Sequence, residues 1–337
     1  MLSPKPQDAY GAWTELARYS GEKFRFPRGN RPLHWQHGWS SSLQNLDPDL
    51  VVGEDGRASS QKADGFLVGR HDQVEFLNGH GFESVRAIGL PFVYALENVG
   101  AQADRKAGSL LVMPGDHATE EVTTRNWEGD TGYIAFLRTF AGDFSEIRVM
   151  LHGADIRLGR DLRWVDAGFE VSRGADYFDP TSLNRLAMAL MGADSVTTND
   201  LGSHVPYAAA AGCRVSIAGP VPRSAASTFS HQTFYRNRPD LVALVRAVGK
   251  SQEEELNALG LFTPPSDGKR HVAWGLGEIG WDHRLEPSEV LRTLHQVGTF
   301  PPDSILNLLR RIPFVYVASK RARNFFQRAR DRKIESS

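Results

Sequence analysis

The sequence predicts an α/β fold built on doubly wound, largely parallel sheets and followed by a helical C-terminal segment. Strand-like runs of β-branched and apolar residues alternate along the chain with runs whose apolar residues recur at helical spacing. Polar or glycine-containing turns directly follow several of these strands. The chain of 337 residues is longer than the size at which a single core stops growing, which favours two domains.

The first domain is predicted over residues 1–106. Residues 12–19 are expected to form a short helix, and a strand that begins at Leu33 is expected to end near His37. The elements expected next are a turn at 53–56, a strand at 66–68, a helical turn at 73–78 and a strand at 85–88. The polar stretch 97–107 has no clear period, and we expect the domain boundary there.

The second domain is predicted over residues 107–300. Its expected elements are strands at 108–114, 146–151 and 163–168 and helices at 131–140, 240–248, 253–259 and 288–296. A literal GxGxxG motif at 275–280 is not expected to bind a dinucleotide, because a loop is expected after it and only 271–274 could precede it as a strand. We expect a connection that returns toward the first domain instead.

The clearest pattern lies within residues 179–220. An apolar stripe at helical spacing is formed by Leu183, Leu186, Ala187, Leu190 and Met191. Asp179 or Thr181 is expected to cap this helix, and Gly192 to end it in the left-handed conformation. The elements expected after it are a strand at 195–198, a turn at 199–204, a helix capped by Ser203 and a strand at 214–218.

Several polar residues are expected to share one edge of the second sheet. His117, His152 and the turn 199–204 each follow a predicted strand, and the carboxyl ends of parallel strands meet at one edge. Helices that begin there direct unpaired N–H groups toward anions. The corner Gly202-Ser203-His204 is therefore a candidate site for a phosphate or diphosphate.

The composition is that of an ordinary globular protein, with 41% hydrophobic and 23% charged residues. A net charge of -1 argues against a nucleic-acid footprint over the whole protein, and the single Cys213 fits a reducing compartment. No signal peptide is expected, because the N-terminal residues contain no apolar run of signal-peptide length, and no run reaches the roughly 18 apolar residues that a membrane span needs. The chain is predicted to be cytoplasmic.

Residues 301–337 are expected to form a basic helix, because lysine and arginine dominate between positions 310 and 333 and alternate with aromatic residues. Two roles stay open for it. The helix packs across both domains with a solvated basic face, or it lies on an anionic membrane surface at the inner face of the membrane. RNA binding is the poorer third choice, because no nucleic-acid module accompanies the charge.

Several short motifs lie between residues 33 and 220. They are Trp35-Gln36-His37-Gly38, Gly89-Leu90-Pro91, Gly168, Asp179-Pro180, Leu183, the stretch 193–199 and Gly202-Ser203-His204-x-x-Tyr207-Ala208-x-x-x-Gly212. The later motifs resemble the donor-binding half of GT-B glycosyltransferases, particularly those of bacterial surface-polysaccharide assembly. The first two resemble the His-Gly and Gly-x-Pro motifs of teichoic-acid and capsule polymerases.

The resemblance implies two Rossmann-like domains that face a cleft, with a nucleotide sugar held mainly by the second domain and a glycan or lipid-linked acceptor by the first. An inverting transfer needs a general base for the acceptor hydroxyl, and His37 is the candidate, with Asp116 and Asp55 as rivals. The departing phosphate needs donors, for which Ser203 and either His204 or His117 are suitable.

The remaining implied contacts to the nucleotide sugar are His152, Thr198, Asn199, Gly202 and Tyr207. No metal site is predicted, because the histidines at 34 and 37 lack further ligands, and no cofactor is predicted beyond the donor substrate. Tyr207 stands where large retaining families carry a glutamate for the ribose, which argues against that subgroup. The triplet Glu54-Asp55-Gly56 resembles a sialyltransferase motif and hints at a CMP-linked sugar.

Two alternatives to a glycosyltransferase stay open. A sugar-nucleotide 2-epimerase shares the fold and converts a donor without an acceptor, although it needs acidic cleft residues that the sequence does not place. The other alternative is a non-catalytic protein that binds a sugar or nucleotide within a polysaccharide-assembly complex. In that case Ser203 would matter for binding and His37 would not.

Overall fold

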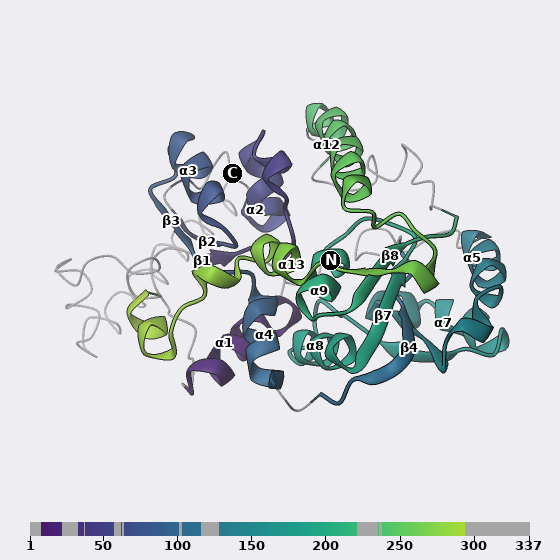
Figure 1. Ribbon diagram of the computed structural model, residues 1–337. Coiled ribbons are helices and arrows are strands. Elements are labelled where there is room, and N and C mark those ends of the chain that lie inside the picture. Colours follow the sequence, from purple (N-terminus) through teal and green to yellow (C-terminus); the bar gives the residue numbers. More distant parts are fainter. Residues whose placement is uncertain are drawn as a thin grey trace, which may run out of the picture.

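The structure is a computed structural model, and it describes residues 8–21, 33–36, 38–56, 62, 64–100, 103–115, 128–220, 235 and 238–293. Its strands form a three-stranded sheet and a six-stranded sheet, which Figure 1 shows on opposite sides of a group of helices. The predicted α/β class with largely parallel sheets is confirmed, and the architecture is compatible with two Rossmann-like units.

The first sheet is parallel throughout and has the order β1-β2-β3. Its strands are β1 (Leu33–Trp35), β2 (Gly65–Val68) and β3 (Ser84–Ala87). Its helices are α1 (Ala12–Ser20), α2 (Pro48–Gly56), α3 (His71–Gly79) and α4 (Pro91–Val99). Both faces of β2 are covered, since each of its residues is buried, and this agrees with its uninterrupted apolar run Phe66-Leu67-Val68.

The second sheet has the order β6-β5-β4-β7-β8-β9, in which only β9 is antiparallel to its neighbour. Its strands are β4 (Lys106–Val112), β5 (Glu146–Leu151), β6 (Glu170–Arg173), β7 (Ala193–Thr198), β8 (Arg214–Ile217) and β9 (Lys269–Arg270). The helices are α5 (Glu128–Arg138), α6 (Gly153–Arg157), α7 (Arg160–Asp166), α8 (Ser182–Gly192), α9 (His204–Ala210), α12 (Pro239–Ala258) and α13 (Val272–Glu278). From β4 the chain adds β5 and β6 on one side, and it then adds β7 and β8 on the other side of β4.

The two sheets share one hydrophobic core. A single cluster of buried side chains contains Leu67 of β2 and Ile88, which directly follows β3, together with Leu111 and Val196 of the second sheet. Helix α4 packs against α8 between the sheets. Four residues of the predicted apolar stripe of α8 are buried in this cluster, and Met191 packs against it partly buried. The N-terminal segment joins in as well, because Tyr10 N donates to Tyr177 O over 3.0 Å.

The GxGxxG motif at 275–280 serves close packing. A Cβ on Gly275 would lie 2.4 Å from Ala210 N, and a Cβ on Gly280 would lie 1.9 Å from Gly69 O. Gly280 also has a φ of +74°, which favours glycine. The motif lies mostly inside α13, so 271–274 is not a strand, and the segment joins α9 to the first sheet as the expected return connection.

Four predictions of secondary structure or backbone conformation are wrong. The segment expected to be a strand at 163–168 lies mostly in the helix α7. The buried residues of this helix are Arg160 and Trp164, one turn apart, while its apolar residues Leu162 and Val165 are exposed. The expected turn at 53–56 is the end of α2. Gly192 is not left-handed, since α8 passes directly into extended Ala193. The helices expected at 240–248 and 253–259 are one helix, α12.

Candidate functional site

The order of the second sheet reverses between β4 and β7, and ligands of doubly wound sheets bind at the carboxyl edge of such a switch point. Gly115 follows β4 there, Asn199 follows β7, and Gly219 follows β8. Figure 1 shows β4, β7 and β8 side by side in the second sheet. This edge is the candidate site.

Asn199 connects three strand ends across this edge. Its Oδ1 accepts a hydrogen bond from Gly115 N over 3.0 Å, and its Nδ2 donates to Pro220 O over 2.7 Å. A Cβ on Gly115 would lie 2.0 Å from the Cβ of Asp200, so only glycine fits. The sequence predicted Asn199 at this edge, and the structure places it at the centre of the edge.

A tight corner precedes α9. Thr198 is buried, and its Oγ1 lies 2.8 Å from Nε2 of His204 and accepts from Asp200 N over 3.2 Å. Gly202 lies under the His204 ring, since an added Cβ would come within 3.0 Å of that ring. Three of the predicted nucleotide-sugar contacts, Thr198, Gly202 and His204, are therefore brought together.

Ser203 does not cap α9, which corrects the sequence expectation. Its Oγ instead accepts a hydrogen bond from Trp39 N over 2.8 Å, so it joins the loop after β1 to the start of α9. The α-region backbone of Ser203 (φ -57°, ψ -24°) explains this, because a capping side chain requires an extended backbone.

Tyr207 lies between the two sheets. Its ring stacks on Phe92 of α4 with centroids 4.1 Å apart, and only 3% of the residue is exposed. Burial raises the pKa of the Tyr207 hydroxyl, and a hydrogen bond with Ser203 opposes that shift. The structure thus places Tyr207 in the packing of α9 on α4.

His152 lies at the end of β5, as its position after that strand predicted. Its Nδ1 accepts from Ala154 N over 3.2 Å, which makes it the cap of α6. The ring also faces Tyr10 with centroids 6.2 Å apart. His152 therefore follows a strand next to β4, at the same edge of the sheet as the switch point.

A buried ionic network supports the end of β4. Arg160 donates to Asp130 from Nε and Nη2 over 2.8 and 2.7 Å, and from Nη1 to Asp155 over 2.9 Å. Its Nη2 also lies 3.2 Å from Gly115 O, and Trp164 Nε1 donates to Asp130 over 3.2 Å. This network was missed from the sequence, where the spacing of Arg160 and Trp164 was its only local signal.

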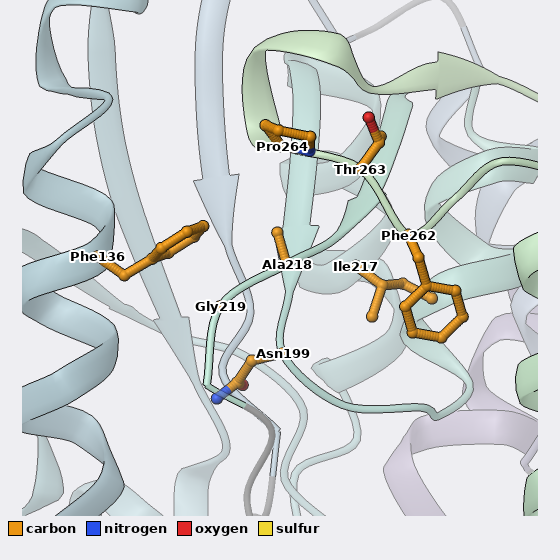
Figure 2. Close-up of a pocket in the computed structure, with 8 residues that line it drawn as sticks. All are labelled: Phe136, Asn199, Ile217, Ala218, Gly219, Phe262, Thr263 and Pro264. Atoms are coloured by element: carbon orange, nitrogen blue, oxygen red, sulfur yellow. The ribbon is translucent and has the colours of Figure 1, made fainter.

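A pocket of about 300 Å³ lies beside the switch point. It is lined by Phe136, Asn199, Ile217, Ala218, Gly219, Phe262, Thr263 and Pro264. Figure 2 shows Phe136 entering from α5 on one side, with Phe262, Thr263 and Pro264 on the other side and Ala218 and Gly219 between them. The sequence did not predict this pocket, since its aromatic walls come from distant parts of the chain.

The predicted catalytic residues His37, Asp116 and His117 lie outside the described residues, and so do the side chain of Asp55 and the basic segment 310–333. Within the described ranges, no group of three or more His, Cys, Asp or Glu side chains could hold a metal ion. In the same part of the chain, no helix has the length and apolar character needed to cross a membrane.

The chain was compared with known protein families, with curated proteins and with solved structures, and none of the three comparisons finds a significant match.

Proposed function

We propose that the protein is a glycosyltransferase that uses a nucleotide-activated sugar as donor and a glycan or lipid-linked hydroxyl compound as acceptor. The position of Asn199 carries this proposal. Its amide ties β4 to β8 at the switch point and also lines the pocket. A ligand in that pocket therefore lies at the edge where doubly wound sheets bind nucleotides.

The pocket suits a nucleobase. Phe136 and Phe262 supply aromatic walls for a planar ring, while Thr263 supplies a polar side chain. A volume of about 300 Å³ is at the lower limit for ligand pockets, so it fits a base better than a whole nucleotide. The phosphates would then extend toward the corner of Thr198, Gly202 and His204.

The finer assignment belongs to the same proposal. It comprises the GT-B class, transfer without a metal ion, a role in surface-polysaccharide synthesis and a place in the cytoplasm or on the inner face of the membrane. From the sequence, His37, Asp116 and His117 are the candidates for side chains at the reacting centre. These residues lie on the segments that follow β1 and β4.

A ligand screen tests the proposal. We expect UDP, GDP or CMP, or one of their sugars, to raise the melting temperature, because a ligand at 100 times its Kd stabilises a protein by about 2.7 kcal/mol. Thr263→Trp should abolish this shift by filling the pocket. Ser266→Trp is the matched control, since Ser266 is exposed in the same loop and does not line the pocket.

Turnover is then measured as nucleotide release with oligosaccharide and lipid-linked acceptors. Release that depends on an acceptor supports the proposal. Conversion of the donor sugar without an acceptor would favour the epimerase, and binding without turnover would favour a binding protein. If no nucleotide binds, or if Thr263→Trp binds as well as the wild type, the assignment of this pocket is wrong.

A further inference from the structure

The carboxyl edge of the first sheet is covered by the end of α13. Leu90 N donates to Ile279 O over 2.9 Å, directly after β3. Gly280 lies so close to the end of β2 that a Cβ would come within 1.9 Å of Gly69 O. These main-chain contacts fix Glu278, the last residue of α13, at the edge where a parallel sheet presents its ligand site.

Two donors hold the same oxygen of Glu278. Trp39 Nε1 donates to Oε2 over 2.6 Å, and Arg70 Nη1 donates to Oε2 over 3.1 Å and to the Glu278 carbonyl over 3.2 Å. No donor within the described residues contacts Oε1, and 17% of the side chain remains exposed. The carboxylate is therefore held in one orientation through Oε2, and among the described residues Oε1 has no donor.

Trp39 links Glu278 to the switch-point corner. Its indole N–H donates to Glu278, while its main-chain N–H donates to Ser203 Oγ over 2.8 Å. Gly38 lies against the same hydroxyl, since a Cβ there would be 3.5 Å from Ser203 Oγ. Trp39 thus connects the Glu278 carboxylate to the corner before α9 through one hydrogen bond at each end.

The surroundings of Glu278 make it a better proton acceptor than an ordinary glutamate. Burial raises the pKa of its carboxyl, and the negative charges of Glu255 on α12 and Asp72 on α3 add to this, while Arg70 and Trp39 oppose it. The net effect raises the pKa, so this carboxylate takes up a proton more readily than an exposed glutamate does. A carboxyl with a raised pKa at the ligand edge of a sheet is a candidate functional group.

We propose that Glu278 accepts the proton of the acceptor hydroxyl during sugar transfer, an inference that rests on the proposed function. The acceptor O–H bond breaks and its proton passes to Oε1 of Glu278. A bond forms between the acceptor oxygen and the anomeric carbon of the donor. The bond from that carbon to the phosphate breaks, and its electron pair leaves on the phosphate oxygen.

Glu278→Gln tests this role, because the amide keeps an oxygen for Trp39 and Arg70 but cannot take up a proton at neutral pH. We expect kcat for nucleotide release to fall by about 100-fold or more. The donor KM and the thermal shift produced by the active nucleotide sugar should stay within about twofold of the wild type, and the melting temperature should not fall. Glu278→Asp should recover part of the activity.

The control is Glu253→Gln, an exposed glutamate on α12, which should behave as wild type. The pH profile of kcat gives a second readout, since the acidic limb should disappear in Glu278→Gln. Unchanged kcat with an unchanged acidic limb would overturn the inference and leave the glycosyltransferase proposal standing. A loss of activity together with a lowered melting temperature would show that Glu278 stabilises the fold and would overturn its catalytic role. If the wild type turns over no donor at all, both proposals fall.

Discussion

Replacing Arg160 with methionine tests how the end of β4 is held. Arg160 and Asp130 are 3% and 4% exposed, and the guanidinium donates hydrogen bonds to two carboxylates and to the Gly115 carbonyl. Methionine fills much of the space but leaves both carboxylates buried without their cation. Removing one partner from a buried ion pair costs about 3–5 kcal/mol of unfolding free energy.

This loss is measured by urea unfolding followed by tryptophan fluorescence and circular dichroism. At roughly 2 °C per kcal/mol for a large chain, we expect the melting temperature to fall by about 6–10 °C. Arg163→Met, on an exposed position of the same helix, should change the unfolding free energy by less than about 0.5 kcal/mol. A loss below about 1 kcal/mol for Arg160→Met would show that the network contributes little and refute this account of the β4 end.

Two further predictions concern packing and acid stability. Gly275→Ala should lower the free energy of unfolding by about 1–3 kcal/mol in urea, because its Cβ would lie 2.4 Å from Ala210 N. Gly277→Ala is the control and should be neutral or stabilising, since nothing lies within 4 Å of its Cβ; equal effects of the two changes would contradict the packing role. Burial alone would raise the pKa of Asp179, but hydrogen bonds from Thr181 and Arg185 hold it at about 2, below its ordinary 3.8. Its stabilisation is thus present above pH 4 and is lost as the pH falls through 2. Asp179→Asn should therefore cost about 1–2 kcal/mol at pH 7 and clearly less at pH 2 in denaturant titrations, and a cost independent of pH would contradict this.

Elements with a strong local pattern agree closely with prediction. The strand expected at 146–151 is β5 (Glu146–Leu151), and the apolar stripe expected from Leu183 to Met191 lies on α8. The strand expected at 163–168 is wrong because α7 directs a charged residue, Arg160, toward the core, and this hides its helical period. Local pattern fails where burial depends on a partner from another element.

In the candidate site too, some residues were predicted from local pattern and others were not. Asn199, Thr198, Gly202 and His204 were predicted because turn residues follow a β-branched strand, and parallel topology brings such turns to one edge. Glu278 lay in a motif whose glycines were expected to form a connection. Its orientation at the first sheet depends on Trp39 and Arg70, which are far away in the sequence and adjacent only in the fold.

The sequence by itself determined the α/β class, the main strands and the placement of polar turns at strand ends, because periodicity and turn chemistry act over a few neighbouring residues. The tertiary structure alone decided that both sheets share one core and that Tyr207 packs on Phe92. It also decided that Ser203 binds Trp39 instead of capping its helix. These outcomes depend on contacts between segments that are distant in the sequence. A local pattern predicts that a side chain will be buried, but it does not specify which distant segment buries it.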